Sequence, residues 1–277
     1  MIGGLIAAGL AAVLYGVASV FQAIAARRTA SAEGVDPRVL MRVVRQRWFL
    51  AGLAADGAGF VAQFWALQTL PIFVVQSALA ASLAVTAVVA VPMLGLVLTG
   101  RHWAAVGGVC AGLVLLGVSA GVENVHVPSL TFQFALIAAV AVLAVAGAAV
   151  NRLPGRARAA LLGLVAGLAF GVVAVAARSL GDLAPLRLVR EPATYALVGA
   201  GVVAFLYYTI GLQRASVTTV TAALVIGETV LPSVVGVLVF DDSTRPGFLP
   251  VALAGFVLAV SCSVALARFG DVSPAEA

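Results

Sequence analysis

The chain has 277 residues, of which 63% are hydrophobic and only 10% are charged, and its formal net charge at pH 7 is +5. This composition, with repeated apolar runs of about 20 residues, excludes a soluble globular domain and indicates a polytopic all-helical membrane protein. All 16 basic residues are arginines. Most of them flank apolar runs, where they meet lipid head groups, so the positive charge does not indicate a nucleic-acid partner.

Nine membrane-spanning helices are predicted in chain order. The loops on one side of the membrane would hold twelve arginines and those on the other side four, which predicts an outside N-terminus and a cytoplasmic C-terminus. The Arg-, Ala- and Gly-rich composition is typical of GC-rich bacteria, so we expect a multi-pass protein of the bacterial plasma (inner) membrane. The predicted helices cover about residues 2–25, 48–69, 72–97, 103–121, 131–150, 159–178, 193–212, 216–240 and 248–268.

An internal repeat is visible in the spacing of matching residues. Residues 66–71 align with 211–216, and in the same register Val75, Ala78 and Leu79 match Val220, Ala223 and Leu224. Helices one to four then correspond to helices six to nine. Because corresponding helices are offset by five positions, an odd number, the copies cross the membrane in opposite directions, which is the inverted-repeat design of secondary transporters. We divide the chain into 1–150, the first repeat plus helix five, and 151–277, the second repeat and a short tail.

The most informative single residue is Glu228, a carboxylate at the middle of the helix predicted at 216–240. An acidic group at this depth costs about 2.5 to 3.5 kcal/mol, so we expect it to face the protein interior, water or a cation. Pro232 has no N–H to give to the carbonyl of residue 228, which predicts a kink and a freed carbonyl there. Thr218 and Thr221 share the face of Glu228. The alternative is that Glu228 is only a structural hydrogen-bonding residue.

A second carboxylate, Asp56, lies within the helix predicted at 48–69. Gln63 lies on the same face, and Gly59 between them leaves room for a ligand or for backbone. Asp56 either lines the cavity or is hydrated at its mouth. Gln76 and Thr221 are repeat partners that bring polar groups into apolar helices.

Aromatic and amide side chains are the candidates for a cavity wall, and small residues are the candidates for helix packing. Tyr15, Tyr207 and Gln22 are wall candidates, whereas we expect Trp65 and Tyr208 to anchor at the membrane interface. The small-residue ridges are Gly163, Gly167 and Gly171, and Gly108 and Gly112.

Catalytic and metal-binding motifs are missing from the sequence. It has no HExxH, no Walker A lysine and no Ser/His/Asp set, and Cys110 and Cys262 lack metal-ligand spacing, as do His102 and His126. We therefore expect neither an enzyme nor a cofactor.

Four segments carry a resemblance to a known family: YGVAS (15–19), residues 48–83, WAAVGGVCAGLVLLGVSA (103–120) and LQRASVTTVTAAL (212–224). With them the chain resembles the drug/metabolite transporter (DMT) superfamily, with its EamA-like fold, and is most similar to the nine-helix NIPA-like magnesium transporter branch. The resemblance implies a central cavity lined by the first four helices of each repeat, with helix five peripheral. The eukaryotic members of that branch carry a glutamate at the position of Phe60.

The sequence favours a secondary transporter of a small polar metabolite or amphiphile, in which Glu228 pairs with the substrate or couples transport to protons. The alternative is a Mg²⁺ or other divalent-cation pathway using Glu228, Asp56 and Gln63, since magnesium prefers oxygen ligands and keeps several waters. A membrane scaffold without transport activity is the third hypothesis. The expected partners are the small-molecule or ion substrate and membrane lipid, and a homodimer stays open.

Overall fold

The computed structural model describes residues 2–29, 46–95, 98–121, 128–153, 157–180, 188–212 and 217–267. Within these ranges the chain is helical, with a single isolated bridge between Ala120 and Thr244 and no strand. The helices are α1 (Ile2–Thr29), α3 (Arg47–Leu67), α4 (Ile72–Ala80), α5 (Ser82–Leu94), α6 (Gly100–Ser119), α7 (Leu130–Asn151), α8 (Ala157–Ser179), α10 (Pro192–Leu212), α11 (Val217–Val239) and α12 (Leu249–Ala267).

Nine spans long and apolar enough to cross a membrane are present in the described part of the chain, which confirms the predicted number. The third span differs in detail from the prediction of one helix over 72–97. It consists of α4 and α5, separated at Ala81. It also ends early, because Gly95 adopts a left-handed conformation (φ +68°) that closes the C-terminus of α5. The chain is thus an all-helical, multi-pass membrane protein.

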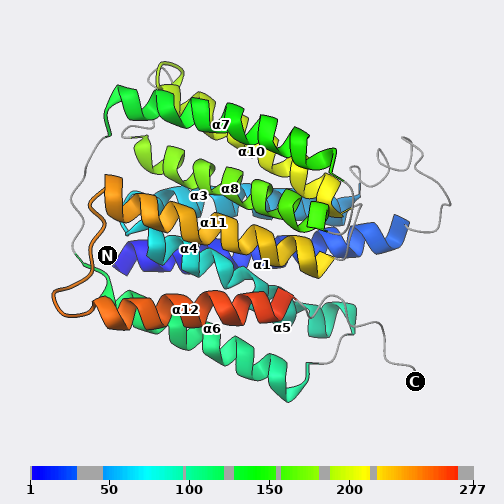
Figure 1. Cartoon of the computed structure of the whole chain (residues 1–277). Coiled ribbons are helices and arrows are strands. Elements are labelled where there is room, and N and C mark those ends of the chain that lie inside the picture. Colours follow the sequence, from blue (N-terminus) through cyan, green and yellow to red (C-terminus); the bar gives the residue numbers. More distant parts are fainter. Residues whose placement is uncertain are drawn as a thin grey trace.

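The spans lie side by side in one bundle, and the chain crosses it alternately (Figure 1). We call the end at which α1 begins and α11 connects to α12 the N-terminal end, and the other the opposite end. α7 lies at one edge, where it packs on α8 and α10, while α6 packs on α12 at the other edge. α1, α4, α8 and α11 lie between these edges, so side chains from both halves of the chain meet there.

Glycines decide how closely the central helices pack. A Cβ at Gly167 would overlap the backbone carbonyl of Leu224, and a Cβ at Gly171 would lie 2.8 Å from Cγ of Pro232. The predicted Gly163, Gly167 and Gly171 ridge is therefore the surface of α8 against which α11 packs. α6 and α12 make a similar contact, because a Cβ at Gly112 would lie 2.7 Å from the carbonyl oxygen of Gly255.

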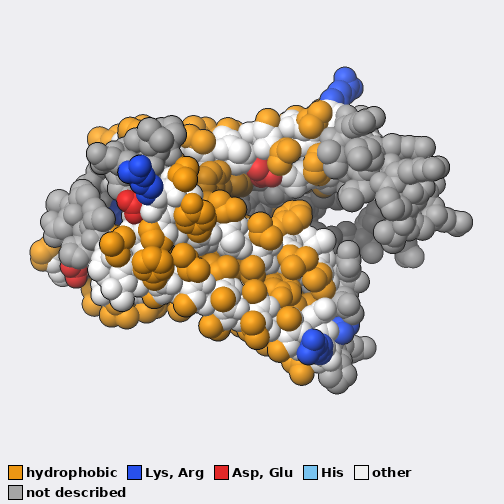
Figure 2. Space-filling model, turned by 90° about the horizontal axis from the view of Figure 1, so that it is seen from above, with side chains coloured by type: hydrophobic (Ala, Val, Ile, Leu, Met, Phe, Trp, Pro, Cys, Tyr) orange, Lys and Arg blue, Asp and Glu red, His pale blue; other side chains and the backbone are white. Residues whose placement is uncertain are grey.

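The outer surface of the bundle is apolar. Val145 on α7, Phe205 on α10 and Leu238 on α11 are 70%, 69% and 75% exposed, as expected for side chains that contact lipid tails. Figure 2 shows this character on one face, where hydrophobic side chains spread along the helices and most charged groups lie toward the ends. The core is most continuous in α8, where residues 171–180 are all buried.

Candidate functional site

Two polar pairs join α1 to α3. The hydroxyl of Tyr15 donates to Oε1 of Gln63 at 2.7 Å, and Nε2 of Gln22 donates to Oδ2 of Asp56 at 2.5 Å. Tyr15 and Gln22 are two helical turns apart on α1, and so are Asp56 and Gln63 on α3. Because the two helices run in opposite directions, each residue meets a partner across the interface. Asp56 and Gln63 therefore share one face, as the sequence predicts.

Two glycines let these pairs form. A Cβ at Gly59 would lie 3.2 Å from Cε1 of Tyr15, and a Cβ at Gly52 would lie 3.0 Å from Cγ of Gln22. The room that the sequence predicts beside Gly59 is thus taken by the ring of Tyr15. The close approach of the helices fixes the position of the Tyr15 hydroxyl.

Gln76 reaches Glu228 from α4. Its Nε2 donates to the backbone carbonyl oxygen of Glu228 at 2.6 Å. This is the carbonyl that Pro232 leaves without its usual helical donor, as expected from the sequence. α11 nevertheless runs as one helix from Val217 to Val239, so Pro232 does not end it. Gln76 is only 4% exposed, and its Oε1 has no hydrogen-bond partner among the described residues.

The side chain of Glu228 accepts no hydrogen bond and forms no ion pair with any residue that the structure describes. It retains partial exposure inside the bundle. Tyr15 is close enough to interact electrostatically with both Asp56 and Glu228, and Tyr208 with Glu228. Tyr15 therefore links the α1–α3 pairs to α11.

The cluster takes its polar groups from both halves of the chain. The hydroxyl of Tyr208 lies 3.4 Å from Oγ1 of Thr221, so Tyr208 faces α11 and does not serve as the interface anchor expected from the sequence. Trp65 is 61% exposed, as expected for a residue that faces lipid. We define the central cluster by its residues: Tyr15, Gln22, Asp56, Gln63, Gln76, Tyr208, Thr221 and Glu228.

Two predicted site residues, Tyr207 and Thr218, are not part of this cluster. Tyr207 turns to α7, where its hydroxyl donates to the carbonyl oxygen of Ala144 at 2.5 Å and its ring covers Gly147. The structure therefore does not bring Tyr207 to the central cluster. The side chain of Thr218 lies outside the described residues.

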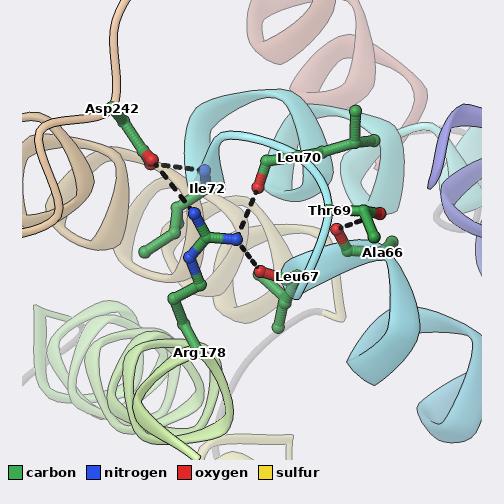
Figure 3. A network of polar contacts seen from close by, with 7 residues as sticks. All are labelled: Ala66, Leu67, Thr69, Leu70, Ile72, Arg178 and Asp242. Carbon is green, nitrogen blue, oxygen red and sulfur yellow. Dashed lines mark hydrogen bonds and ion pairs between the residues drawn. The ribbon is translucent and has the colours of Figure 1, made fainter. Parts of the chain in front are cut away.

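A charged network that the sequence analysis missed lies at the N-terminal end (Figure 3). NH2 of Arg178, in the last turn of α8, lies 3.6 Å from Oδ1 of Asp242, and both residues are buried, 8% and 5% exposed. NH1 of Arg178 also donates to the carbonyl oxygens of Leu67 and Leu70, and the N–H of Ile72 donates to Oδ2 of Asp242 at 2.6 Å. The predicted helix over 159–178 already includes Arg178, and α8 ends one residue later at Ser179. No local pattern indicated that Arg178 has a charged partner.

A pocket of about 330 Å³ lies apart from this chemistry, between α4, α11 and α12. Its walls include Phe73, Val234, Leu253 and Phe256, and the exposed atoms of its lining are apolar. It has no charged lining residue, so it does not extend the central cluster.

Metal-ligand groupings are scarce in the part of the chain that the structure describes. No group of three or more His, Cys, Asp or Glu side chains lies together there. A cation held by Asp56 or Glu228 would therefore keep much of its hydration shell.

No protein-family model, curated protein or solved structure matches the chain.

Proposed function

We propose that this protein is a secondary transporter that moves a small polar metabolite or amphiphile across the bacterial inner membrane by alternating access. The observation that carries this proposal is the central cluster: polar side chains from both halves of the chain meet around Glu228, a carboxylate without a hydrogen-bonding partner among the described residues. An ionisable group inside a membrane bundle is costly, and its usual reason is function. A scaffold would gain nothing from such a group.

The packing of the helices supports an inverted-repeat architecture of the DMT type. α1 packs on α3, α4 and α5 in the first half, and α8 packs on α10 and α11 in the second half. The proposed repeat partners α4 and α11 touch each other, as do α6 and α12. In such folds the substrate binds near the midplane between the repeats. The central cluster draws its residues from both proposed repeats, which supports a substrate site there.

Within this proposal each polar group has a role. Glu228 pairs with the substrate or exchanges a proton with it, and the free Oε1 of Gln76 and the amide of Gln63 supply hydrogen bonds. Tyr15 lies within electrostatic range of both carboxylates and would contact a substrate beside them. Asp56, held by Gln22, adds a second negative charge along the path.

The test is a ligand screen on the purified protein in detergent. Metabolites that bind should raise its apparent melting temperature by mass action, and Mg²⁺ is included as a separate ligand. Ligands that stabilise the protein are then tested for uptake into proteoliposomes. Glu228→Gln should abolish proton-coupled uptake while ligand stabilisation remains and becomes independent of pH, and the exposed carboxylate Asp241, replaced by Asn, provides the matched control.

Two outcomes would contradict the proposal. Stabilisation and uptake of Mg²⁺ alone, abolished by Asp56→Asn and by Glu228→Gln, would favour the divalent-cation pathway. Uptake that is the same for Glu228→Gln and for the wild type would remove the central cluster from the mechanism.

A further inference from the structure

We propose that Arg178 and Asp242 form a latch that closes the N-terminal end of the transport path, so that this structure is the state whose central cluster opens only to the opposite end. The latch consists of the Arg178–Asp242 ion pair together with the Leu67 and Leu70 carbonyls and the Ile72 N–H that the pair binds. This inference rests on the proposed function, because a latch has meaning only where a path opens and closes.

The latch joins the two halves of the chain at one corner. Leu67, Leu70 and Ile72 belong to the turn between α3 and α4 in the first half, whereas Arg178 ends α8 and Asp242 follows α11 in the second half. A further hydrogen bond crosses the same boundary, from Nε2 of Gln68 to the carbonyl oxygen of Ala177 at 2.8 Å. Moving one half against the other must break all of these contacts together.

Each charge of the latch binds a helix end of opposite polarity. Arg178 binds carbonyls at the C-terminal end of α3, where the helix dipole is negative. Asp242 accepts the N–H of Ile72, the first residue of α4, where the dipole is positive. Pro71 has no N–H and its side chain cannot cap α4, so Asp242 takes the place of an N-cap from another part of the chain. The α3–α4 turn is therefore capped by the other half of the protein.

Burial differs between the latch and the central cluster. Leu70 and Ile72 at the latch, and Val75 and Ala174 next to it on α4 and α8, are all 0% exposed, so these side chains form a closely packed plug. Tyr15, Asp56 and Glu228 in the central cluster keep partial exposure. Opening the path to the N-terminal side requires the plug to separate at the contacts that the latch holds.

A buried ion pair suits a reversible closure. The two charges lose hydration when the latch forms, and their mutual attraction offsets this loss, so the net free energy of the intact pair is small. When the end opens, water restores the hydration of both charges. Removing one partner is different, because the other charge then stays buried without compensation in the closed state.

Gly236 offers a way to disturb the latch without removing a charge. Asp242 folds back over the end of α11, where its N–H donates to the carbonyl oxygen of Gly236 at 3.1 Å. A Cβ at Gly236 would lie 2.5 Å from Oδ2 of Asp242. Gly236→Ala should therefore push the carboxylate away from Arg178 and from Ile72 while every ionisable group remains.

The experiment reads the accessibility of cysteines in sealed membrane vesicles of known orientation, in a background with Cys110→Ser and Cys262→Ala. One reporter is Ala174→Cys, one turn beneath Arg178 on α8, and the second is Leu83→Cys, which is partly exposed in α5. The latch variants are Arg178→Gln and Gly236→Ala, and Asp241→Asn is the control in the same connection. A membrane-impermeant thiol reagent is applied from each side.

We expect the reagent to reach the Ala174 reporter from the N-terminal side roughly tenfold faster in both latch variants than in the wild type, and the Leu83 reporter more slowly from the opposite side. The Asp241→Asn control should match the wild type. Equal rates at the Ala174 reporter in folded latch variants and wild type would overturn the latch. A rise at both reporters together with a lower melting temperature would show that the ion pair only stabilises the fold, and would also overturn it.

The failure of the latch and the failure of the proposed function have different signatures. If a transported ligand shifts both reporters in opposite directions while the latch variants behave as the wild type, transport stands and the latch is wrong. If neither a ligand nor a variant shifts the reporters in opposite directions, the protein does not alternate, and both proposals fall.

Discussion

The side-chain amide of Gln76 on α4 donates to the backbone carbonyl oxygen of Glu228 on α11 at 2.6 Å. A residue of the first half thus supplies the hydrogen bond that Pro232 withholds within α11. The same contact holds the backbone of Glu228 in place while leaving its carboxylate unbonded among the described residues. Gln76 therefore fixes the backbone of Glu228 without occupying its carboxylate, which stays available to a substrate or a proton.

Gln76→Leu should lower the free energy of unfolding by about 1 to 3 kcal/mol, because the buried Glu228 carbonyl loses its donor. In a Pro232→Ala background residue 232 has an N–H for that carbonyl, so the same Gln76→Leu change should cost less. Thermal unfolding of the four proteins in detergent gives the coupling between the two positions. Equal costs in both backgrounds would mean that Gln76 acts through another contact.

Glu228→Gln should make substrate binding independent of pH between about 5 and 9, whereas binding to the wild type should change across that interval. Glutamine keeps the size and hydrogen-bonding capacity of the side chain but cannot change its charge. Binding is measured as the ligand-induced shift in melting temperature at each pH. A mutant that follows the wild-type pH profile would show that Glu228 is structural.

Gly167→Ala should destabilise the protein by at least about 1 to 3 kcal/mol, because the added methyl group overlaps the carbonyl of Leu224 and forces α8 away from α11. Gly201→Ala on α10 is the matched control, since a Cβ there would have no neighbour within 4 Å. Melting temperatures of both variants test this difference. A milder effect at Gly167 than at Gly201 would contradict the packing.

The stability of the protein should depend on pH through the buried carboxyl group of Asp242. Burial raises the pKa of its carboxyl group above the ordinary value, although the Ile72 N–H and the charge of Arg178 oppose this shift. The folded protein therefore holds the proton to a higher pH than the unfolded chain, so its stability should fall as pH rises through this interval. Arg178→Gln removes the opposing charge, and its deficit against wild type should grow with pH toward about 3 to 5 kcal/mol.

Melting curves between about pH 3 and pH 8 test this sign, because the series begins below the ordinary Asp pKa of about 3.9 and extends well above it. Asp242→Asn should remove this contribution from the pH profile. A deficit of Arg178→Gln that shrinks as pH rises would contradict the assignment.

The nine spans could be predicted because each depends on local composition. Apolar runs of sufficient length identify the helices without reference to their neighbours, and the structure places all nine within a few residues of the prediction. The end of α5 at Gly95 was missed, because apolar residues continue past it and only the left-handed backbone marks the boundary. The glycine ridge of α8 was recognisable from its spacing, but the partner helix was not.

The candidate site was predictable in its members and less so in its contacts. Helical spacing placed Asp56 and Gln63 on one face, and Pro232 indicated a free carbonyl at Glu228. The donor to that carbonyl comes from another helix, and no local pattern identifies it. Tyr207 was predicted at the cavity wall, but it faces α7 and its neighbour Tyr208 faces α11 instead. The sequence does not distinguish the two adjacent tyrosines. Arg178 and Asp242 lie far apart in the chain, so only tertiary packing pairs them.

The position of α7 has a consequence for how the chain can be inserted. α7 packs on α8 and α10 at the edge of the bundle and contributes nothing to the central cluster. α7 adds one crossing of the membrane. It therefore determines the side from which each later helix enters the membrane. Without α7, each later helix would cross the membrane in the opposite direction, which the distribution of the arginines disfavours. An edge helix with few neighbours thus determines the orientation of half the protein.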